Sequence, residues 1–86
     1  MDINGEYIGY WLYCQEETLI LSLTLAKIQR KAIRETKGKR KKRKLKDRLI
    51  ELNYAIQIYE ININSMCVLK GIDRKDNYDT FKGFDR

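Results

Sequence analysis

The 86-residue sequence contains no histidine and no proline, and it has only two cysteines and five glycines. Without histidine, and with Cys14 and Cys67 far apart rather than in a Cys-x-x-Cys pair, it offers no familiar zinc-binding ligand set. We therefore expect no metal site and no cofactor, and we expect both cysteines to be buried, reduced thiols; an intramolecular disulfide is the alternative. The absence of proline and the scarcity of glycine favour long, uninterrupted helices.

Long apolar runs and targeting signals are also missing. The segment Leu19–Leu23 is too short for a transmembrane helix, and Glu16 and Glu17 would lie inside any span placed over residues 7–26. The first residues lack the basic region of a secretory signal. We expect a cytoplasmic protein without a membrane partner.

Residues suited to catalysis are equally scarce. Glu16 and Glu17 are adjacent, so they point in different directions around a helix and do not form a carboxylate pair. Ser22 and Ser65 have no recognisable base, and no glycine-rich phosphate loop occurs. These absences predict that the protein is not an enzyme.

Positive charge is abundant but concentrated in one part of the chain. Residues 27–48 hold 13 of the 18 Lys and Arg residues but only Glu35 and Asp47 of the 12 acids. This window therefore carries a formal charge of +11, whereas the rest of the chain, with 5 cations and 10 acids, carries −5. Clustered like charges repel one another, so such a cluster indicates an anionic partner.

The first half of the chain has the apolar spacing of a helix. Residues recur alternately four and three positions apart, which places them on one helix face: Tyr7, Trp11, Cys14, Thr18, Leu21, Leu25, Ile28 and Ala32. A neighbouring row widens this face: Ile8, Leu12, Leu19, Ala26 and Ile33. Asn4 is a candidate N-cap, and Gly5 and Gly9 weaken the first turns. The aromatic-rich segment 6–13 also fits a short strand.

The second half has a stronger helical pattern. Its main row alternates four and three positions apart: Leu45, Leu49, Leu52, Ile56, Tyr59, Ile63 and Met66. A flanking row widens it: Ile50, Tyr54, Ile61 and Val68. Lys70 followed by Gly71 predicts the end of this helix, with Ile72 available for a capping contact.

Gly38 is the only obvious helix breaker between the two patterns. One architecture is a hairpin that reverses near residues 36–41, and the other is one continuous helix from about residue 10 to 70 that pairs with other chains. Continuous helices packed in parallel would stack their basic segments, so we predict an all-α helical hairpin of two long antiparallel amphipathic helices. One hairpin cannot cover both wide apolar faces, which predicts self-association into a bundle, most simply a dimer.

The chain divides into two parts. We predict a helical hairpin domain over residues 1–72, with a basic tip around residues 37–48, and a charged, aromatic tail over residues 73–86. In the tail, Tyr78, Phe81 and Phe84 are spaced by three. We expect them to pack back on the hairpin, because exposed aromatics at this spacing would form an adhesive patch; contact with a second subunit and use as a docking peptide are the alternatives.

Within the basic segment, Arg40–Lys44 would begin the second helix, where the helix dipole disfavours cations. Cations that oppose the helix dipole over a whole turn indicate a candidate functional site. We predict a non-enzymatic module that binds the phosphates of DNA or structured RNA. The block contains no Asn, Gln or aromatic residue, which favours recognition of backbone shape over bases. The residues predicted to bind, called the tip cations below, are Arg30, Arg34, Lys37, Lys39, Arg40, Lys41, Lys42, Arg43, Lys44, Lys46 and Arg48.

Other interpretations of the same cluster stay open. The protein would alternatively be a small accessory protein of phage or plasmid type that binds and inhibits or sequesters a host protein through an acidic surface. A third interpretation is a nucleotide ligand held between subunits, and a fourth is a solvated, solubilising loop. An anionic membrane surface is disfavoured, because the basic segment has no apolar face of its own.

Overall fold

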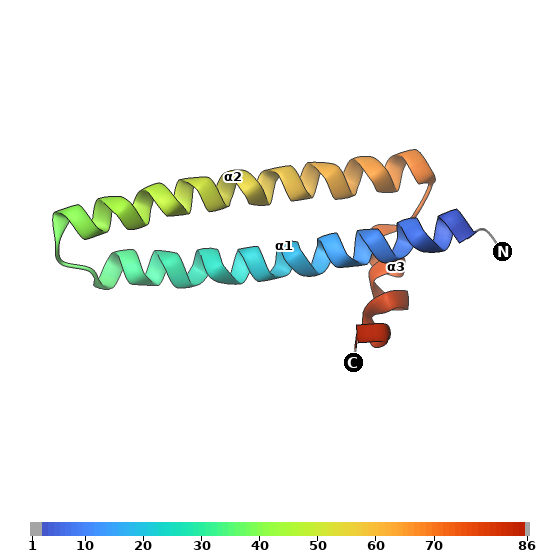
Figure 1. Cartoon of the computed structure of the whole chain (residues 1–86), viewed down its shortest axis with the longest axis horizontal. Coiled ribbons are helices and arrows are strands. Elements are labelled where there is room, and N and C mark those ends of the chain that lie inside the picture. Colours follow the sequence, from blue (N-terminus) through green and yellow to red (C-terminus); the bar gives the residue numbers. More distant parts are fainter. Residues whose placement is uncertain (1–2, 86) are drawn as a thin grey trace.

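The computed structural model describes the backbone of residues 3–85 and the side chains of residues 6–83, and over this range the fold is all-α. Two long antiparallel helices, α1 (Ile3–Glu35) and α2 (Lys39–Lys70), form a hairpin, which a short helix α3 (Arg74–Phe81) and a 3-10 turn (Lys82–Asp85) follow (Figure 1). The Cα atoms extend over 57 × 27 × 16 Å. The predicted helical hairpin is confirmed; the continuous helix and the strand over residues 6–13 are wrong.

The reversal occupies residues 36–38, within the predicted range. Thr36 closes the end of α1, because its backbone N–H and its hydroxyl both donate to the Ala32 carbonyl, at 3.0 and 2.6 Å. Gly38 precedes α2 in an extended conformation with φ −77° and ψ 126°, and it accepts a hydrogen bond of 2.9 Å from the Lys42 N–H. Since its φ is negative, Gly38 is not required there for a left-handed conformation.

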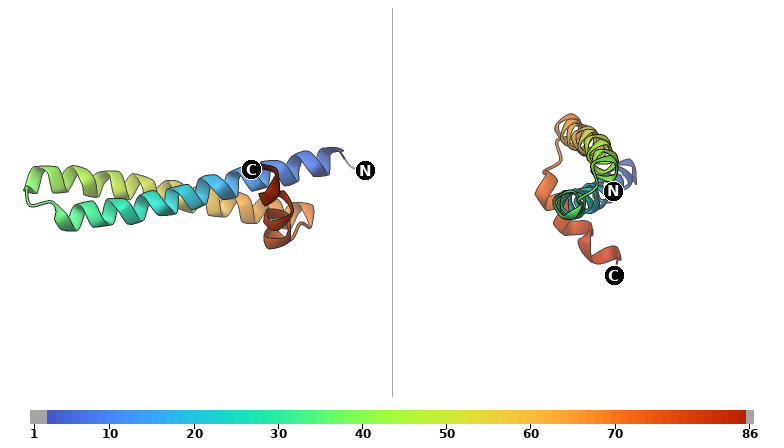
Figure 2. Two further views of the ribbon diagram at one scale, coloured as in Figure 1. Left: turned by 90° about the horizontal axis from the view of Figure 1, so that it is seen from below. Right: turned by 90° about the vertical axis from the view of Figure 1, so that its left-hand side faces the viewer.

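The end of α2 agrees with the sequence prediction. Gly71 adopts a left-handed conformation with φ 62° and ψ 34°, which favours glycine. The Ile72 N–H donates to the Cys67 carbonyl at 2.9 Å, and the Ile72 side chain packs against the core. This cap turns the chain back toward α1, so that α3 lies against the end of the hairpin away from the reversal (Figure 2).

The hairpin core contains the main row that the sequence predicts on α2, but on α1 it contains the predicted flanking row rather than the main row. Leu12 and Leu19 of α1 are 2% exposed and pack with Ile63 and Cys67 of α2, and Ala26, farther along the same face of α1, is fully buried. The predicted main row of α1 is largely exposed instead. Small side chains give the physical reason: Ala26 and Ser22 form a narrow strip against which α2 can approach, and Ser22 satisfies its hydroxyl on the Thr18 carbonyl at 2.9 Å.

The tail forms α3 and packs on α1. Asp73 caps this helix by accepting a hydrogen bond of 3.0 Å from the Asp76 N–H. Tyr78 stacks against Tyr13 with 5.5 Å between ring centroids, and Phe81 meets Tyr10 edge-on at 6.1 Å. The predicted packing of the tail is therefore confirmed for Tyr78 and Phe81. The side chain of Phe84 and the predicted cap at Asn4 lie outside the described side chains.

Both cysteines are free thiols, as predicted; the predicted burial is confirmed for Cys67, whereas Cys14 is half-buried. Desolvation raises the pKa of the Cys67 thiol above its ordinary value. A neutral, shielded thiol is a poor nucleophile, so Cys67 acts here as a core residue.

Candidate functional site

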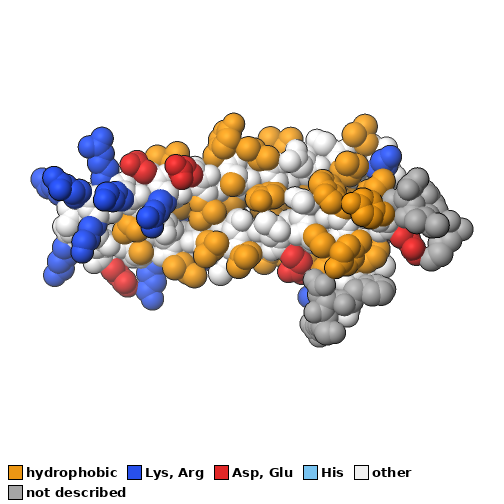
Figure 3. Space-filling model, in the orientation of Figure 1, with side chains coloured by type: hydrophobic (Ala, Val, Ile, Leu, Met, Phe, Trp, Pro, Cys, Tyr) orange, Lys and Arg blue, Asp and Glu red, His pale blue; other side chains and the backbone are white. Residues whose placement is uncertain are grey.

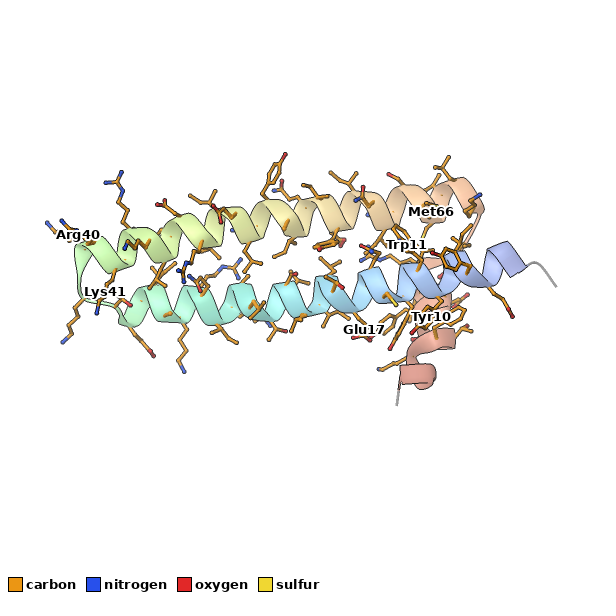
Figure 4. All side chains as sticks on the ribbon, viewed as in Figure 1. Tyr10, Trp11, Glu17, Arg40, Lys41 and Met66 are labelled. Carbon is orange, nitrogen blue, oxygen red and sulfur yellow. The ribbon has the colours of Figure 1, made fainter. Side chains whose placement is uncertain are left out.

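The eleven tip cations all lie at the closed end of the hairpin, on both sides of the reversal. Lys42 is half-buried and the other ten are exposed. Figure 3 shows basic side chains gathered at this end, and Figure 4 labels Arg40 and Lys41 where they project from the start of α2. The fold thus converts a sequence cluster into a convex positive surface.

These cations have no counter-ion among the side chains that the structure describes. Among the side chains of residues 6–83, the ion pairs are both made by Arg74, at the other end of the hairpin. Glu35 and Asp47, which accompany the cations in the sequence, pair with none of them. The charge of the tip is therefore available to an external anion.

The start of α2 adds to the positive potential. Its first turn contains Lys39 to Lys42 and no acid, and Gly38 supplies no side-chain cap. The first backbone N–H groups of a helix have no partner within the helix, so they carry a partial positive charge in the same place. The end of α1, by contrast, has Arg34 in its last turn, where the dipole favours a cation.

A shallow hollow lies beside the reversal. It has a volume of about 230 Å³ and is lined by three tip cations, a threonine and a leucine: Thr36, Lys41, Lys44, Leu45 and Arg48. The Leu45 carbonyl accepts a hydrogen bond of 3.1 Å from Gln29 Nε2, which joins α1 to the start of α2. Gln29 was not predicted, because nothing in the sequence indicates which carbonyl a polar side chain on the inner face will meet.

The shape of the tip indicates the kind of anion that it suits. Figure 4 shows Arg40 and Lys41 projecting from the end of the hairpin, and ten of the eleven tip cations are exposed on the two helices and the reversal between them. Such a surface can contact several anionic groups spaced along an extended polymer. A small ligand, by contrast, is usually held in an enclosed cavity with a few convergent polar groups, whereas the hollow at the tip is shallow.

A second polar cluster at the open end was not predicted. The Arg74 guanidinium donates to Glu16 Oε2 at 2.6 Å, to Glu60 Oε2 at 3.0 Å and to Asn64 Oδ1 at 2.8 Å. The hydrogen bonds to Glu16, and after them those to Glu60, raise the pKa of Arg74. The cluster fastens α3 to both long helices. Its members come from distant parts of the chain, with Arg74 lying 58 positions from Glu16, so no local pattern in the sequence reveals the cluster.

A hollow of about 320 Å³ next to this cluster is lined by Glu16, Ile20, Arg74, Lys75 and Tyr78. The Tyr78 hydroxyl donates to Glu17 Oε1 at 2.8 Å, and this bond is the main reason why the pKa of Tyr78 is raised. Because the polar groups of Arg74 and Tyr78 already have partners within the protein, this hollow belongs to the attachment of α3.

Two further observations concern the described part of the chain. Over residues 3–85, no group of three or more acidic or cysteine side chains is placed to hold a metal ion. No helix within the same range combines the length and the apolar character needed to cross a membrane.

The chain matches no protein-family model, no curated protein and no solved structure. The interpretation of its function therefore depends on the chemistry of the tip.

Proposed function

We propose that this protein is a non-enzymatic nucleic-acid-binding module of the cytoplasm that contacts the phosphates of DNA or structured RNA through its tip cations. The observation that carries the proposal is the convergence of eleven cations on one end of the hairpin with no counter-ion among the described side chains. Holding like charges together costs stability, and a polyanion offsets that cost. Phosphate contacts of this kind give affinity that depends steeply on salt and little on sequence.

The composition of the tip favours a duplex or a folded RNA over a single strand. Binding of single strands relies on aromatic side chains on which bases stack. Residues 37–48 contain no aromatic residue, and the exposed tyrosines Tyr7, Tyr10 and Tyr54 lie outside that segment. Arginines and lysines on a convex surface suit the regularly spaced phosphates of a helical nucleic acid.

The test compares two charge-matched variants by fluorescence anisotropy with a DNA duplex, an RNA hairpin and a single strand. K41Q/K44Q removes two tip cations, and K70Q/K75Q removes two exposed lysines from the open end. Glutamine has nearly the helix propensity of lysine, so both variants are expected to fold. Between about 50 and 200 mM salt, the tip variant should lose about 1.8 from the slope of log K against log salt on duplex DNA, 0.9 per phosphate contact.

The control variant should keep the wild-type slope, because its lysines lie far from the proposed contact. Absence of binding by the wild-type protein at the lower salt contradicts the proposal. Equal losses in the two variants also contradict it, since they would indicate a general effect of net charge rather than a site.

A second candidate function is that of a small accessory protein that binds and inhibits or sequesters a host protein. Exposed apolar side chains along both long helices favour it, among them Leu21, Ile28, Tyr54 and Ile61. The tail does not favour this candidate, since Tyr78 and Phe81 pack on α1 instead of being free to dock on a partner. A protein partner retained in stoichiometric amount from a nuclease-treated host lysate, and competing with nucleic acid for the tip, would favour this candidate.

A further inference from the structure

One helix of the hairpin carries an apolar row of which Trp11 packs against the core, whereas the middle of the row lies exposed. We call this row, which alternates four and three positions apart, the α1 seam: Tyr7, Trp11, Cys14, Thr18, Leu21, Leu25, Ile28 and Ala32. Strict alternation of this kind over several turns is the pattern of a helix that pairs with another helix. Yet Leu21, Leu25 and Ile28 are 59%, 46% and 58% exposed, because α2 packs on the neighbouring row.

Nothing else in the described chain covers the middle of the seam. α3 reaches α1 at Gly9, Tyr13, Glu16 and Glu17, near the open end. Beyond it, Leu25 and Ile28 border an open hollow of about 410 Å³ that continues onto Arg48 and Leu52 of α2. Figure 3 shows apolar side chains spread along this length of the hairpin, between the open end and the basic end.

The seam is self-complementary, which points to a second copy of the same chain as its occupant. None of the eight seam residues carries a charge, so the same row on two copies can meet around a two-fold axis. A partner of opposite charge would find nothing to pair with in the row itself. Large apolar side chains of two copies would cover each other.

Charge decides the relative direction of the two copies. In a parallel pair, two segments of formal charge +11 would lie side by side, whereas an antiparallel pair places them at opposite ends. The residues that flank the seam agree with this. Glu17 lies seven positions before Thr24, and Lys31 lies seven positions after it. Each directly precedes a residue of the seam, at positions 18 and 32. An antiparallel pair centred near Leu21 and Leu25 therefore brings Glu17 of each copy, whose Oε1 also accepts a hydrogen bond from Tyr78, close to Lys31 of the other.

We propose that two copies pair through the α1 seam in antiparallel orientation, with their basic tips at opposite ends of the dimer. Gly38 lies 15 residues beyond the centre at residue 23, so the two reversals would be about 45 Å apart along the axis at 1.5 Å per residue. If the proposed function holds, on which this consequence rests, the dimer joins two separate nucleic-acid segments instead of gripping one.

Analytical ultracentrifugation tests the seam. At about 100 µM chain, the wild-type protein should sediment as a dimer, and L21Q/I28Q as a monomer of unchanged helix content by circular dichroism. The matched control is I50Q/I61Q, which alters two side chains on the outer surface of α2 that are 66% and 63% exposed, and it should stay dimeric. A monomeric wild-type protein overturns the proposal, and so does dissociation caused by the control pair.

A charge exchange tests the orientation without depending on the apolar variants. Glu17→Lys and Lys31→Glu should each weaken the dimer about tenfold or more, and E17K/K31E should restore it. The two residues are 14 positions apart on one helix, about 21 Å, so they cannot pair within a copy. Lack of restoration in the double variant overturns the antiparallel arrangement.

A distance measurement checks the same point directly. Gly38→Cys offers a labelling site, because a Cβ there meets nothing within 4 Å. With the native cysteines replaced in C14A/C67A, which keeps the seam apolar, spin labels at residue 38 should be about 45 Å apart. Labels within about 20 Å, the spacing of adjacent helices plus two linkers, would show a parallel pair and overturn the proposal.

A bridging assay separates this inference from the proposed function. Two duplexes with different fluorophores should be joined by the wild-type dimer, whereas L21Q/I28Q should bind each duplex without joining them. A dimer that binds no duplex overturns the proposed function but leaves the antiparallel pair intact. A dimer that binds one duplex at a time overturns the joining of two segments.

Discussion

Arg74 donates through Nε to Glu16 Oε2 at 2.6 Å, a contact between residues 58 positions apart in the chain. The same guanidinium reaches Glu60 of α2, at 3.0 Å. One side chain therefore joins all three helices at the open end. Among the described side chains, the tip cations at the closed end have no such partners, so the ion pairs of the hairpin lie at its open end.

Replacing Arg74 should loosen α3. Arg74→Gln leaves the carboxylates of Glu16 and Glu60 without their cation, and we expect a loss of about 2 kcal/mol in the free energy of unfolding, typical of hydrogen bonds to charged groups. Urea unfolding measures it. Lys75→Gln, one position later and exposed, is the control and should change stability by less than about 0.5 kcal/mol. Equal effects of the two substitutions would contradict the role of Arg74.

Gly9 should be required for the docking of α3. A Cβ at this position would lie 2.8 Å from Asn77 Oδ1 and 2.8 Å from Phe81 Cε2. Asn77 has little freedom to move, since its Nδ2 donates to the Gly9 carbonyl at 2.9 Å. Gly9→Ala should therefore speed hydrogen exchange in α3 although alanine favours helix formation in α1. Gly38→Ala, with open space around its Cβ, should leave α3 exchange unchanged.

Alkaline pH should weaken the attachment of α3 through Tyr78. Its hydrogen bond to Glu17 raises the pKa of Tyr78 above the ordinary value of 10.0. A group whose pKa is raised on folding contributes stability that is present below the ordinary pKa and lost as the pH rises past the folded one. Thermal unfolding from pH 8 to 11 should show this loss in the wild-type protein and a smaller one in Tyr78→Phe. Identical profiles would contradict the prediction.

The cations in the first turn of α2 should lower the stability of the protein and strengthen its binding to nucleic acid. Arg40→Glu puts an acid into the first turn of a helix that has none, and we expect a gain of about 0.3–1 kcal/mol in stability. The same change should weaken binding to a DNA duplex. Lys70→Glu, in the last turn of α2, makes the same change of charge where the dipole favours a cation, so it should reduce stability instead. A destabilised R40E variant would contradict the interpretation that cations at the start of α2 reduce stability.

The two leucine rows of α1 should differ in their contributions to the monomer. Leu19 is 2% exposed, so Leu19→Ala should cost about 2–5 kcal/mol through lost burial and the cavity that it leaves. Leu21 is 59% exposed, and Leu21→Ala should cost less than about 1 kcal/mol in dilute solution. Unfolding curves at low protein concentration distinguish the rows. A larger loss for L21A would mean that the seam, and not its neighbour, faces α2.

Several features of this protein follow from the sequence because they depend on nearby residues. The periodic apolar rows predict both long helices, and Gly71 predicts where α2 ends, because a left-handed cap favours glycine. The position of the tip cations also follows, since a reversal near Gly38 places the charged segment at one end of any hairpin. A binding role for that end stays a prediction.

Other features were decided only by tertiary packing. The sequence contains two adjacent apolar rows on α1, and periodicity alone cannot select between them; the small side chains of Ser22 and Ala26 allow α2 to approach one row closely and leave the other exposed. The Arg74–Glu16 contact likewise required the return of the tail after Gly71. Helix formation is a local property of the chain, whereas the face that a helix buries depends on the shape and charge of what packs against it.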